Sequence, residues 1–128
     1  MKFHHIGYLT DNFKSSFNSF KILNYYKKGK IINDELLQVK IQFLENPNNH
    51  LIELVKPYKK NIGLINIFKK KNFAYHFAYK VYDLDNSIKK LKKKFKIIVN
   101  PVPAKAFNNK KVAFLKMENS FIIELIEK

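Results

Sequence analysis

The sequence of 128 residues contains no cysteine, no arginine and no long hydrophobic run. Without cysteine it can form no disulfide, no thiolate metal site and no cysteine nucleophile. Without arginine it lacks the planar group that contacts guanine and phosphate through two hydrogen bonds, so we do not expect a nucleic-acid partner. No stretch approaches the roughly 18 apolar residues that a membrane span needs, and the first residues lack the apolar core of a signal peptide. We therefore expect a cytoplasmic protein with no membrane partner.

All 25 basic residues are lysine, and with ten acidic residues the net charge is +15. The excess of Lys, Asn, Ile, Phe and Tyr resembles the residue usage of an AT-rich genome, which accounts for the charge without a function. The alternative is a positive field that attracts an anionic partner, such as coenzyme A phosphates, an acidic carrier protein or nucleic acid. The hydrophobic share of 46% and the aromatic share of 15% indicate a globular domain that folds alone or as a small oligomer, such as a homodimer.

Two histidines and two glutamates recur at a constant spacing. Glu53 follows His5 by 48 positions (53 − 5), Glu124 follows His76 by 48 (124 − 76), and the second pair comes 71 positions (76 − 5) after the first. A single histidine in an apolar strand is more often an ordinary core or edge residue. A carboxylate between Ile and Leu, however, must face solvent or find a partner. A duplicated module would gather these four side chains as ligands of a divalent zinc, nickel, cobalt or manganese ion.

The first half of the chain has the pattern of a βαβββ module. A strand over Phe3–Thr10 precedes a helix capped by Asp11, and the buried stripe of this helix is Phe13, Phe17 and Phe20. Three strand-like runs follow, at about 25–32, 36–44 and 51–56. After Pro57, a linking helix or turn is expected over Asn61–Lys71, with three residues facing inward: Ile62, Ile65 and Phe68.

The second half repeats this plan. Ala74–Val81 is the first strand, and Asp83 caps a helix with the buried stripe Leu84, Ile88, Leu91 and Phe95. Strands follow near 96–99, 111–116 and 121–126, and Pro101–Asn109 is a loop that could act as a flap. Loop position makes three residues candidate substrate contacts: Lys105, Phe107 and Lys110. We expect a single domain of two repeated modules, 1–57 and 72–128, joined by a short linking helix over 58–71.

Side-chain alternation predicts which residues share a face of the sheet. The two histidines share their faces with small residues, Gly7 in the first module and Ala74 and Ala78 in the second. The opposite face of the second module carries aromatic residues that can pack on the helices: Tyr75, Phe77 and Tyr79. Glu53 and Glu124 point away from their Ile and Leu neighbours. The predicted fold is α+β, with two βαβββ modules forming a curved mixed sheet around a metal site.

Five strings in the chain resemble the vicinal oxygen chelate superfamily, in the single-domain branch that contains methylmalonyl-CoA epimerase and glyoxalase I. They are HHIGY from His4, IELVKP from Ile52, YHFAYKVYD from Tyr75, KVAFL from Lys111 and IELI from Ile123. Their order and spacing extend the resemblance over the entire chain. It implies a glyoxalase-like fold and the metal ligands His5, Glu53, His76 and Glu124.

Some features of the chain resemble the epimerases, and others resemble glyoxalase I. Residues 101–115 are similar to the loop and strand of the epimerases, which favours an acyl-CoA or carrier-bound acyl substrate, although the usual loop glycines are missing. Bacterial epimerases often have Gln where Glu53 stands, and a carboxylate there is more typical of glyoxalase I. Glyoxalase I, in turn, is expected to hold glutathione with arginine, which this chain lacks. The carboxylate that some epimerases have on the third strand has no match in Gln38–Gln42.

The resemblance implies an enzyme that removes a proton next to a carbonyl while a metal ion stabilises the negative charge that develops. The predicted function is therefore a metal-dependent, methylmalonyl-CoA epimerase-like isomerase, with Glu124 or Glu53 as the catalytic base. Two alternatives stay open. One is a glyoxalase I-type lactoylglutathione lyase or a thiol transferase, and the other is a non-catalytic protein that binds a small molecule or nucleic acid. The ligand pairs of one site could come from one chain or from two chains of a dimer.

Overall fold

The computed structural model describes all 128 residues, in eight strands, three α-helices and one short 3-10 helix. The order of these elements gives two successive βαβββ modules, as predicted. The chain divides into two compact units. One contains His5–Tyr75, and the other contains Met1–His4 together with His76–Lys128.

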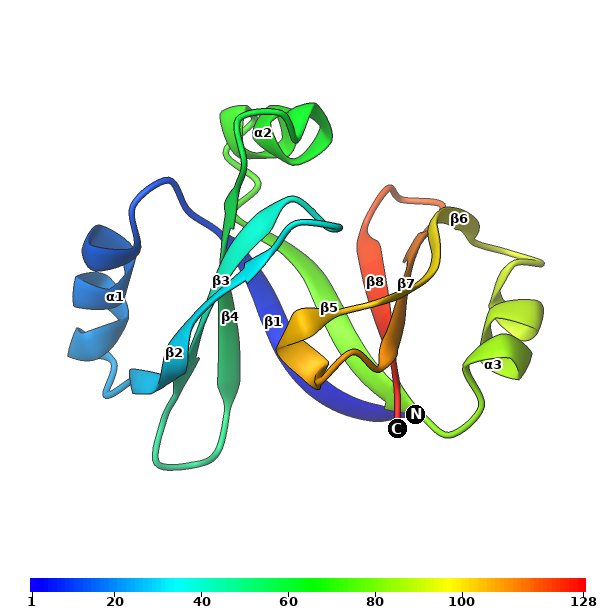
Figure 1. Cartoon of the computed structure of the whole chain (residues 1–128), viewed down its shortest axis with the longest axis horizontal. Coiled ribbons are helices and arrows are strands. Elements are labelled where there is room, and N and C mark those ends of the chain that lie inside the picture. The colour runs from blue at the N-terminus through cyan, green and yellow to red at the C-terminus, as the bar shows by residue number, and fades with distance from the viewer. The chain divides into compact units, whose positions relative to one another are not determined.

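The unit His5–Tyr75 contains four strands in the spatial order β2-β3-β4-β1. Their bounds are β1 (Lys2–Leu9), β2 (Tyr26–Asp34), β3 (Val39–Glu45) and β4 (Leu51–Pro57). β1 is parallel to β4, whereas β3 is antiparallel to both β4 and β2, so the pairing is mixed as predicted. Helix α1 (Phe13–Ile22) lies beside these strands, and α2 (Ile62–Lys69) follows β4 beyond the strand ends (Figure 1).

The predicted aromatic stripe of α1 packs on the core of this unit. Phe13, Phe17 and Phe20 lie against a buried cluster made of Leu44, Ile52 and Leu54. The cap, however, is Asn12 and not Asp11, because the Asn12 side chain accepts a hydrogen bond from the Ser15 N–H at 2.9 Å. Asn12 is held in this position by its own N–H, which donates to Thr10 Oγ1 at 3.0 Å.

Two further expectations for this half were wrong. The third strand begins at Val39 and not near residue 36, because the carboxylate of Asp34 accepts the Leu37 N–H and closes a turn. Ile62 does not face inward but is 61% exposed. Asn61 caps α2 by accepting the Leu64 N–H and also donates to the carbonyls of residues 37 and 38, so Asn61 is turned toward the protein at the start of the helix while Ile62 is turned to solvent.

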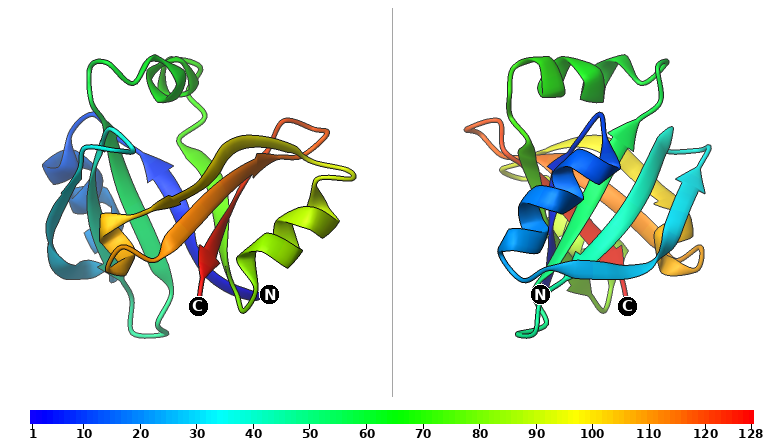
Figure 2. Two further views of the ribbon diagram at one scale, coloured as in Figure 1. Left: turned by 45° about the vertical axis from the view of Figure 1, so that its right-hand side comes forward. Right: turned by 90° about the vertical axis from the view of Figure 1, so that its left-hand side faces the viewer.

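The other unit has four strands of its own in the order β5-β8-β7-β6. Their bounds are β5 (Ala74–Val81), β6 (Lys96–Pro103), β7 (Lys111–Lys116) and β8 (Ile122–Glu127). β5 is parallel to β8, and β7 is antiparallel to both β8 and β6. Helix α3 (Leu84–Leu91) flanks these strands (Figure 2) and is capped by Asp83 as predicted, since its carboxylate accepts the Asn86 N–H.

The core of this unit contains the predicted stripe of α3. Leu84 and Ile88 are buried, and Leu91 and Phe95 pack against the same cluster. Phe77 departs from the prediction that it would pack on a helix. It is 38% exposed and lies against two other aromatic rings, those of Phe3 and Phe121.

The segment predicted as a loop over Pro101–Asn109 is partly regular. Residues 101–103 belong to β6, and a 3-10 helix covers Lys105–Phe107. Ala104 is buried and closes the turn: its N–H donates to the carbonyl of Lys110, and its carbonyl accepts the N–H groups of Phe107 and Asn109. The strand continues past residue 99 because Val102 pairs with Val112 after an irregularity in the register. That this segment acts as a flap stays a prediction.

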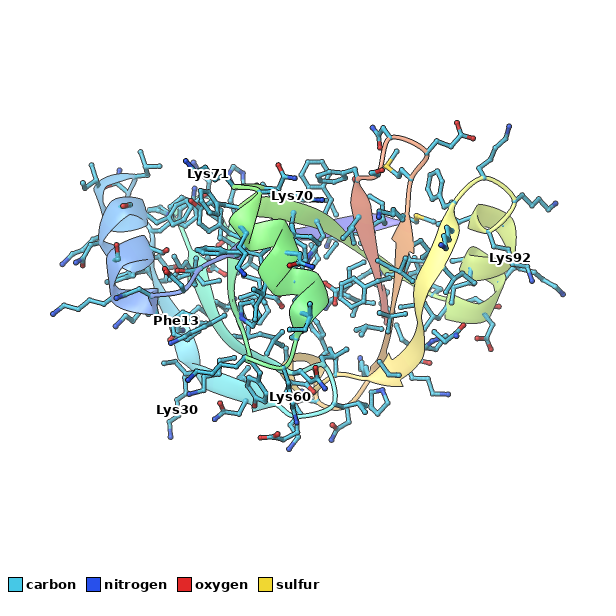
Figure 3. The ribbon with its side chains drawn as sticks, turned by 90° about the horizontal axis from the view of Figure 1, so that it is seen from above. Phe13, Lys30, Lys60, Lys70, Lys71 and Lys92 are labelled. Carbon is cyan, nitrogen blue, oxygen red and sulfur yellow. The ribbon has the colours of Figure 1, made fainter.

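Lysines occupy the exposed surface of both units. Figure 3 shows Lys60 at one end of α2, Lys70 and Lys71 at its other end, and Lys92 after α3, and all four are exposed. This placement agrees with a solvated lysine surface. No helix of the structure is long and apolar enough to cross a membrane.

We predict that Leu125→Ala lowers the free energy of unfolding by about 2–5 kcal/mol, because Leu125 is completely buried and its truncation leaves a cavity. Ile22→Ala is the control, since Ile22 is 83% exposed and its truncation is expected to change stability by about 0.5 kcal/mol or less. Urea denaturation followed by circular dichroism measures both. Equal destabilisation by the two variants would contradict this description of the core.

Candidate metal centre

The register between β1 and β4 brings His5 and Glu53 onto one face of the unit His5–Tyr75. Gly7 lies opposite Glu53 in the parallel pairing, and His5 is two residues before Gly7, so all three side-chain positions share a face. His5 Nε2 lies 3.6 Å from Glu53 Oε1. Both side chains are buried, with 0% of His5 and 4% of Glu53 exposed.

The other unit repeats this arrangement with β5 and β8. Ala78 lies opposite Glu124, and His76 is two residues before Ala78. His76 Nε2 lies 3.1 Å from Glu124 Oε2, and both residues are again buried, at 0% and 2% exposure. The structure therefore brings together each histidine–glutamate pair that the spacing of 48 positions predicts.

The strands that carry the glutamates also anchor the helices. Ile52 and Leu54 point into the cluster beneath α1, so Glu53 between them points to the opposite face. Ile123 and Leu125 do the same beneath α3, which directs Glu124 to the opposite face of its own unit. The predicted alternation is confirmed, and it explains why carboxylates within apolar triplets are buried away from the helices.

The distances within the pairs fit shared coordination of a cation. Two donors that are each about 2.1 Å from one ion lie roughly 3.0–3.4 Å apart at octahedral or tetrahedral angles. The separation of 3.1 Å in one pair falls in this range, and that of 3.6 Å in the other lies slightly above it. Imidazole nitrogen and carboxylate oxygen are ligands that suit zinc, nickel, cobalt and manganese. Each pair is therefore a fitting half of a site for a divalent ion.

Burial gives the carboxylates a physical reason to take up a cation. Moving an ionised carboxylate out of water is costly unless charge or hydrogen bonds compensate for the lost hydration. A divalent ion would supply two positive charges, which match the two carboxylates, while the imidazoles would bind it as uncharged ligands. The residues present therefore fit the metal that the sequence predicts.

The remaining candidates lie elsewhere in their units. His4 is half-buried and its ring lies 5.6 Å from that of Phe107, while His50 is exposed beside Asn46. Both histidines therefore have the packing or surface positions expected of them. Lys105 and Lys110 are exposed at the turn that follows β6. Their contact with a substrate, like that of Phe107, stays a prediction.

Two phenylalanines beside the histidines were missed from the sequence. The ring of Phe43 lies 5.6 Å from that of His5, and the ring of Phe114 lies 5.7 Å from that of His76. Phe114 follows Phe43 by 71 positions (114 − 43), which is the offset between the two histidines. A search for identical apolar residues at the same offset of 71 positions would have identified both phenylalanines.

Comparisons with known proteins agree with this fold. The sequence profile of the Glyoxalase/Bleomycin resistance protein/Dioxygenase superfamily matches residues 4–114. Among solved structures, the chain is similar to the hypothetical protein BH1468 from Bacillus halodurans C-125, with 26% identity, a TM-score of 0.82, and coverage of 99% of this chain and 94% of that one. None of the curated proteins compared with the chain matches it.

Structures of methylmalonyl-CoA epimerases are also similar to the chain. The enzyme from Mycobacterium tuberculosis has 16% identity and a TM-score of 0.83, with coverage of 98% of this chain and 87% of that one. A variant from Streptomyces coelicolor, solved with 2-nitronate-propionyl-CoA, has 13% identity and a TM-score of 0.81, with coverage of 100% and 97%. At these identities the likeness shows the fold alone, and the predicted glyoxalase-like fold is confirmed.

We predict that Ala78→Val destabilises the protein by about 1–3 kcal/mol, because Ala78 is completely buried opposite Glu124 and two added methyl groups would overpack this position. Ala74→Val in the same strand is the matched control. Ala74 is exposed, so the added β-branch should be neutral or slightly stabilising. Urea denaturation measures both variants, and an Ala78→Val protein as stable as the wild type would contradict tight packing at this position.

Proposed function

Since the chain belongs to the Glyoxalase/Bleomycin resistance protein/Dioxygenase superfamily, we propose that it is a metal-dependent epimerase or isomerase that moves a proton at the carbon next to a carbonyl. The observation that carries this proposal is the buried histidine–glutamate pair that recurs in both units. Two neutral imidazoles and two carboxylates would form one site with no net charge once a divalent ion is bound.

The proposed ligands are the four candidate metal-binding side chains: His5, Glu53, His76 and Glu124. His5 and His76 would bind through Nε2, the nitrogen that lies beside the carboxylate in each pair. A divalent ion bound here supplies positive charge for a carbonyl oxygen that becomes negative as the neighbouring carbon loses a proton. Zinc, nickel, cobalt and manganese all suit this set of donors.

The proton would be carried by a glutamate. A carboxylate acts as a base when one of its oxygens comes within hydrogen-bond reach of the carbon acid. Each glutamate has one oxygen beside its histidine, Glu53 through Oε1 and Glu124 through Oε2. The second oxygen of one glutamate would accept the proton at one face of the carbon, and the other glutamate, in its protonated form, would donate a proton to the opposite face. Either glutamate suits this role, and one on each side of the carbon would serve an epimerase.

The proposed substrate is an acyl thioester, as in methylmalonyl-CoA epimerase. Structures similar to this chain were solved with methylmalonyl-CoA and with 2-nitronate-propionyl-CoA. The net charge of +15 would also favour an anionic substrate such as an acyl-CoA or an acyl group on an acidic carrier. The cytoplasmic location and the homodimer stay predictions from the sequence.

A second candidate is a glyoxalase I-type lyase or a thiol transferase. It is favoured by Glu53, because bacterial epimerases often have Gln at this position whereas a carboxylate is more typical of glyoxalase I. This reaction needs a thiol such as glutathione, whereas an epimerase does not. Dependence of turnover on an added thiol therefore distinguishes the two activities.

We predict that the purified protein binds one divalent ion per chain and that His5→Ala or His76→Ala abolishes this stoichiometric binding. His50→Ala is the control, because His50 is exposed and belongs to neither pair. Elemental analysis by mass spectrometry after dialysis against each metal gives the stoichiometry. A wild-type protein that takes up no divalent ion would refute the proposed site and favour a non-catalytic binding protein.

We predict that the metal-loaded protein incorporates solvent deuterium at the α-carbon of methylmalonyl-CoA. Glu124→Gln should lower the exchange rate by about 10²–10⁴-fold, because a neutral amide cannot accept the proton. Glu118→Gln, a change at an exposed glutamate, should retain wild-type exchange. Nuclear magnetic resonance follows the exchange, and the same measurement on a hemithioacetal, in place of methylmalonyl-CoA, tests the glyoxalase-type alternative. Full activity of Glu124→Gln would exclude Glu124 as the sole base.

A further inference from the structure

We propose that Phe43 and Phe114 are positioning residues that hold the imidazoles of His5 and His76 in the orientation needed to bind the metal. This inference rests on the proposed function, because it assumes that the two histidines are ligands. It adds one aromatic side chain to each histidine–glutamate pair and so defines the same three-residue arrangement in both units.

In the unit His5–Tyr75, the three side chains come from three neighbouring strands, β1, β4 and β3 (Figure 1). Glu53 on the middle strand lies directly opposite Phe43 on β3. The rings of His5 and Phe43 are nearly perpendicular, at 84°, with their centroids 5.6 Å apart.

This contact requires both rings to lean over the middle strand. Neighbouring strands lie about 4.8 Å apart, so β1 and β3 are separated by roughly 10 Å. Centroids at 5.6 Å therefore mean that the side chains of His5 and Phe43 converge above β4, the strand that carries Glu53. The imidazole is thus directed toward the carboxylate from one side while the phenyl ring packs against it from the other.

The second unit contains the same contact. Phe114 on β7 lies opposite Glu124 on β8, and its ring lies 5.7 Å from the ring of His76, at 82°. The two contacts therefore differ by 0.1 Å and 2°. Each contact lies within one of the two units.

Comparison of equivalent positions in the two modules shows that aromatic residues of the first module are not always aromatic in the second. On the helix side of the strands, the stripe of Phe13, Phe17 and Phe20 becomes Leu84, Ile88 and Leu91 after the same offset of 71 positions. Apolar volume alone thus suffices to pack the helices. The ring beside the histidine is phenylalanine in both modules, which indicates a requirement for its shape.

A perpendicular ring gives the histidine a preferred plane as well as a neighbour. Aromatic pairs favour edge-to-face geometry because the face of one ring is electronegative and the edge of the other is electropositive. A leucine would fill much of the same space without this directional preference. The side chains around metal ligands commonly set both the ligand orientation and the access of water, and their loss weakens metal binding by about 10–100-fold.

The test is a titration of the metal-free protein with Co²⁺, followed by visible absorption, which reports both affinity and coordination geometry. Phe43→Leu and Phe114→Leu should each raise the dissociation constant about tenfold and shift the cobalt absorption bands. Phe43→Tyr, which keeps the ring, should restore the affinity and the spectrum.

The matched controls are Phe20→Leu and Phe95→Leu, one in each unit. Both residues are half-buried and pack against the helix-side clusters, so their replacement removes an aromatic ring without touching a histidine. These variants should lose stability but keep the wild-type cobalt affinity and spectrum. Equal weakening by the controls would show a general effect of core loosening and overturn the inference.

The outcomes separate this inference from the proposed function. A wild-type protein that binds no Co²⁺ defeats the proposed function, and the positioning role with it. A wild-type protein that binds Co²⁺ while both leucine variants retain its affinity and spectrum defeats the positioning role alone. If a leucine variant does not fold by circular dichroism, Phe43→Met and Phe114→Met replace it, with the same tenfold weakening expected and unchanged binding as the contradicting result.

Discussion

The proposed metal site depends on the burial of a carboxylate against an imidazole, once in each unit. Glu53 and Glu124 are almost fully buried, and such groups need compensation for the hydration that they lose. They point away from the helices because Ile and Leu on either side of each glutamate anchor the strand beneath a helix. The apolar residues that stabilise the fold thus direct the proposed metal ligands to the opposite face of the same strand.

The duplication shows which features of the chain the site requires. The register that places Gly7 opposite Glu53 recurs as Ala78 opposite Glu124. Beneath α1 and α3, however, the packing changes from aromatic to aliphatic residues. Cores tolerate such exchanges when apolar character and volume are kept. Strand register, and not the identity of individual core residues, therefore places the histidine beside its glutamate.

Much of this arrangement follows from local patterns in the sequence. The strand over Ala74–Val81, the cap Asp83 and the two histidine–glutamate pairs follow from alternation, capping chemistry and the repeat. The contacts of Phe43 and Phe114 could not be read from alternation, because they join strands that are two apart and depend on strand order. The cap Asn12 was missed because Asp11 and Asn12 are both good capping residues, and only the backbone geometry selects between them. The exposure of Ile62 was missed because it depends on how the first turn of α2 is oriented toward the rest of the unit.

In the proposed site, the two histidine–glutamate pairs would bind one ion jointly. Crystals grown with Co²⁺ and measured at the cobalt absorption edge test it most directly, because anomalous scattering locates the ion without assumptions about activity. One anomalous peak per site, coordinated by His5, Glu53, His76 and Glu124, is the predicted result. Separate peaks at the two pairs, or no peak at either, would refute joint binding of one ion.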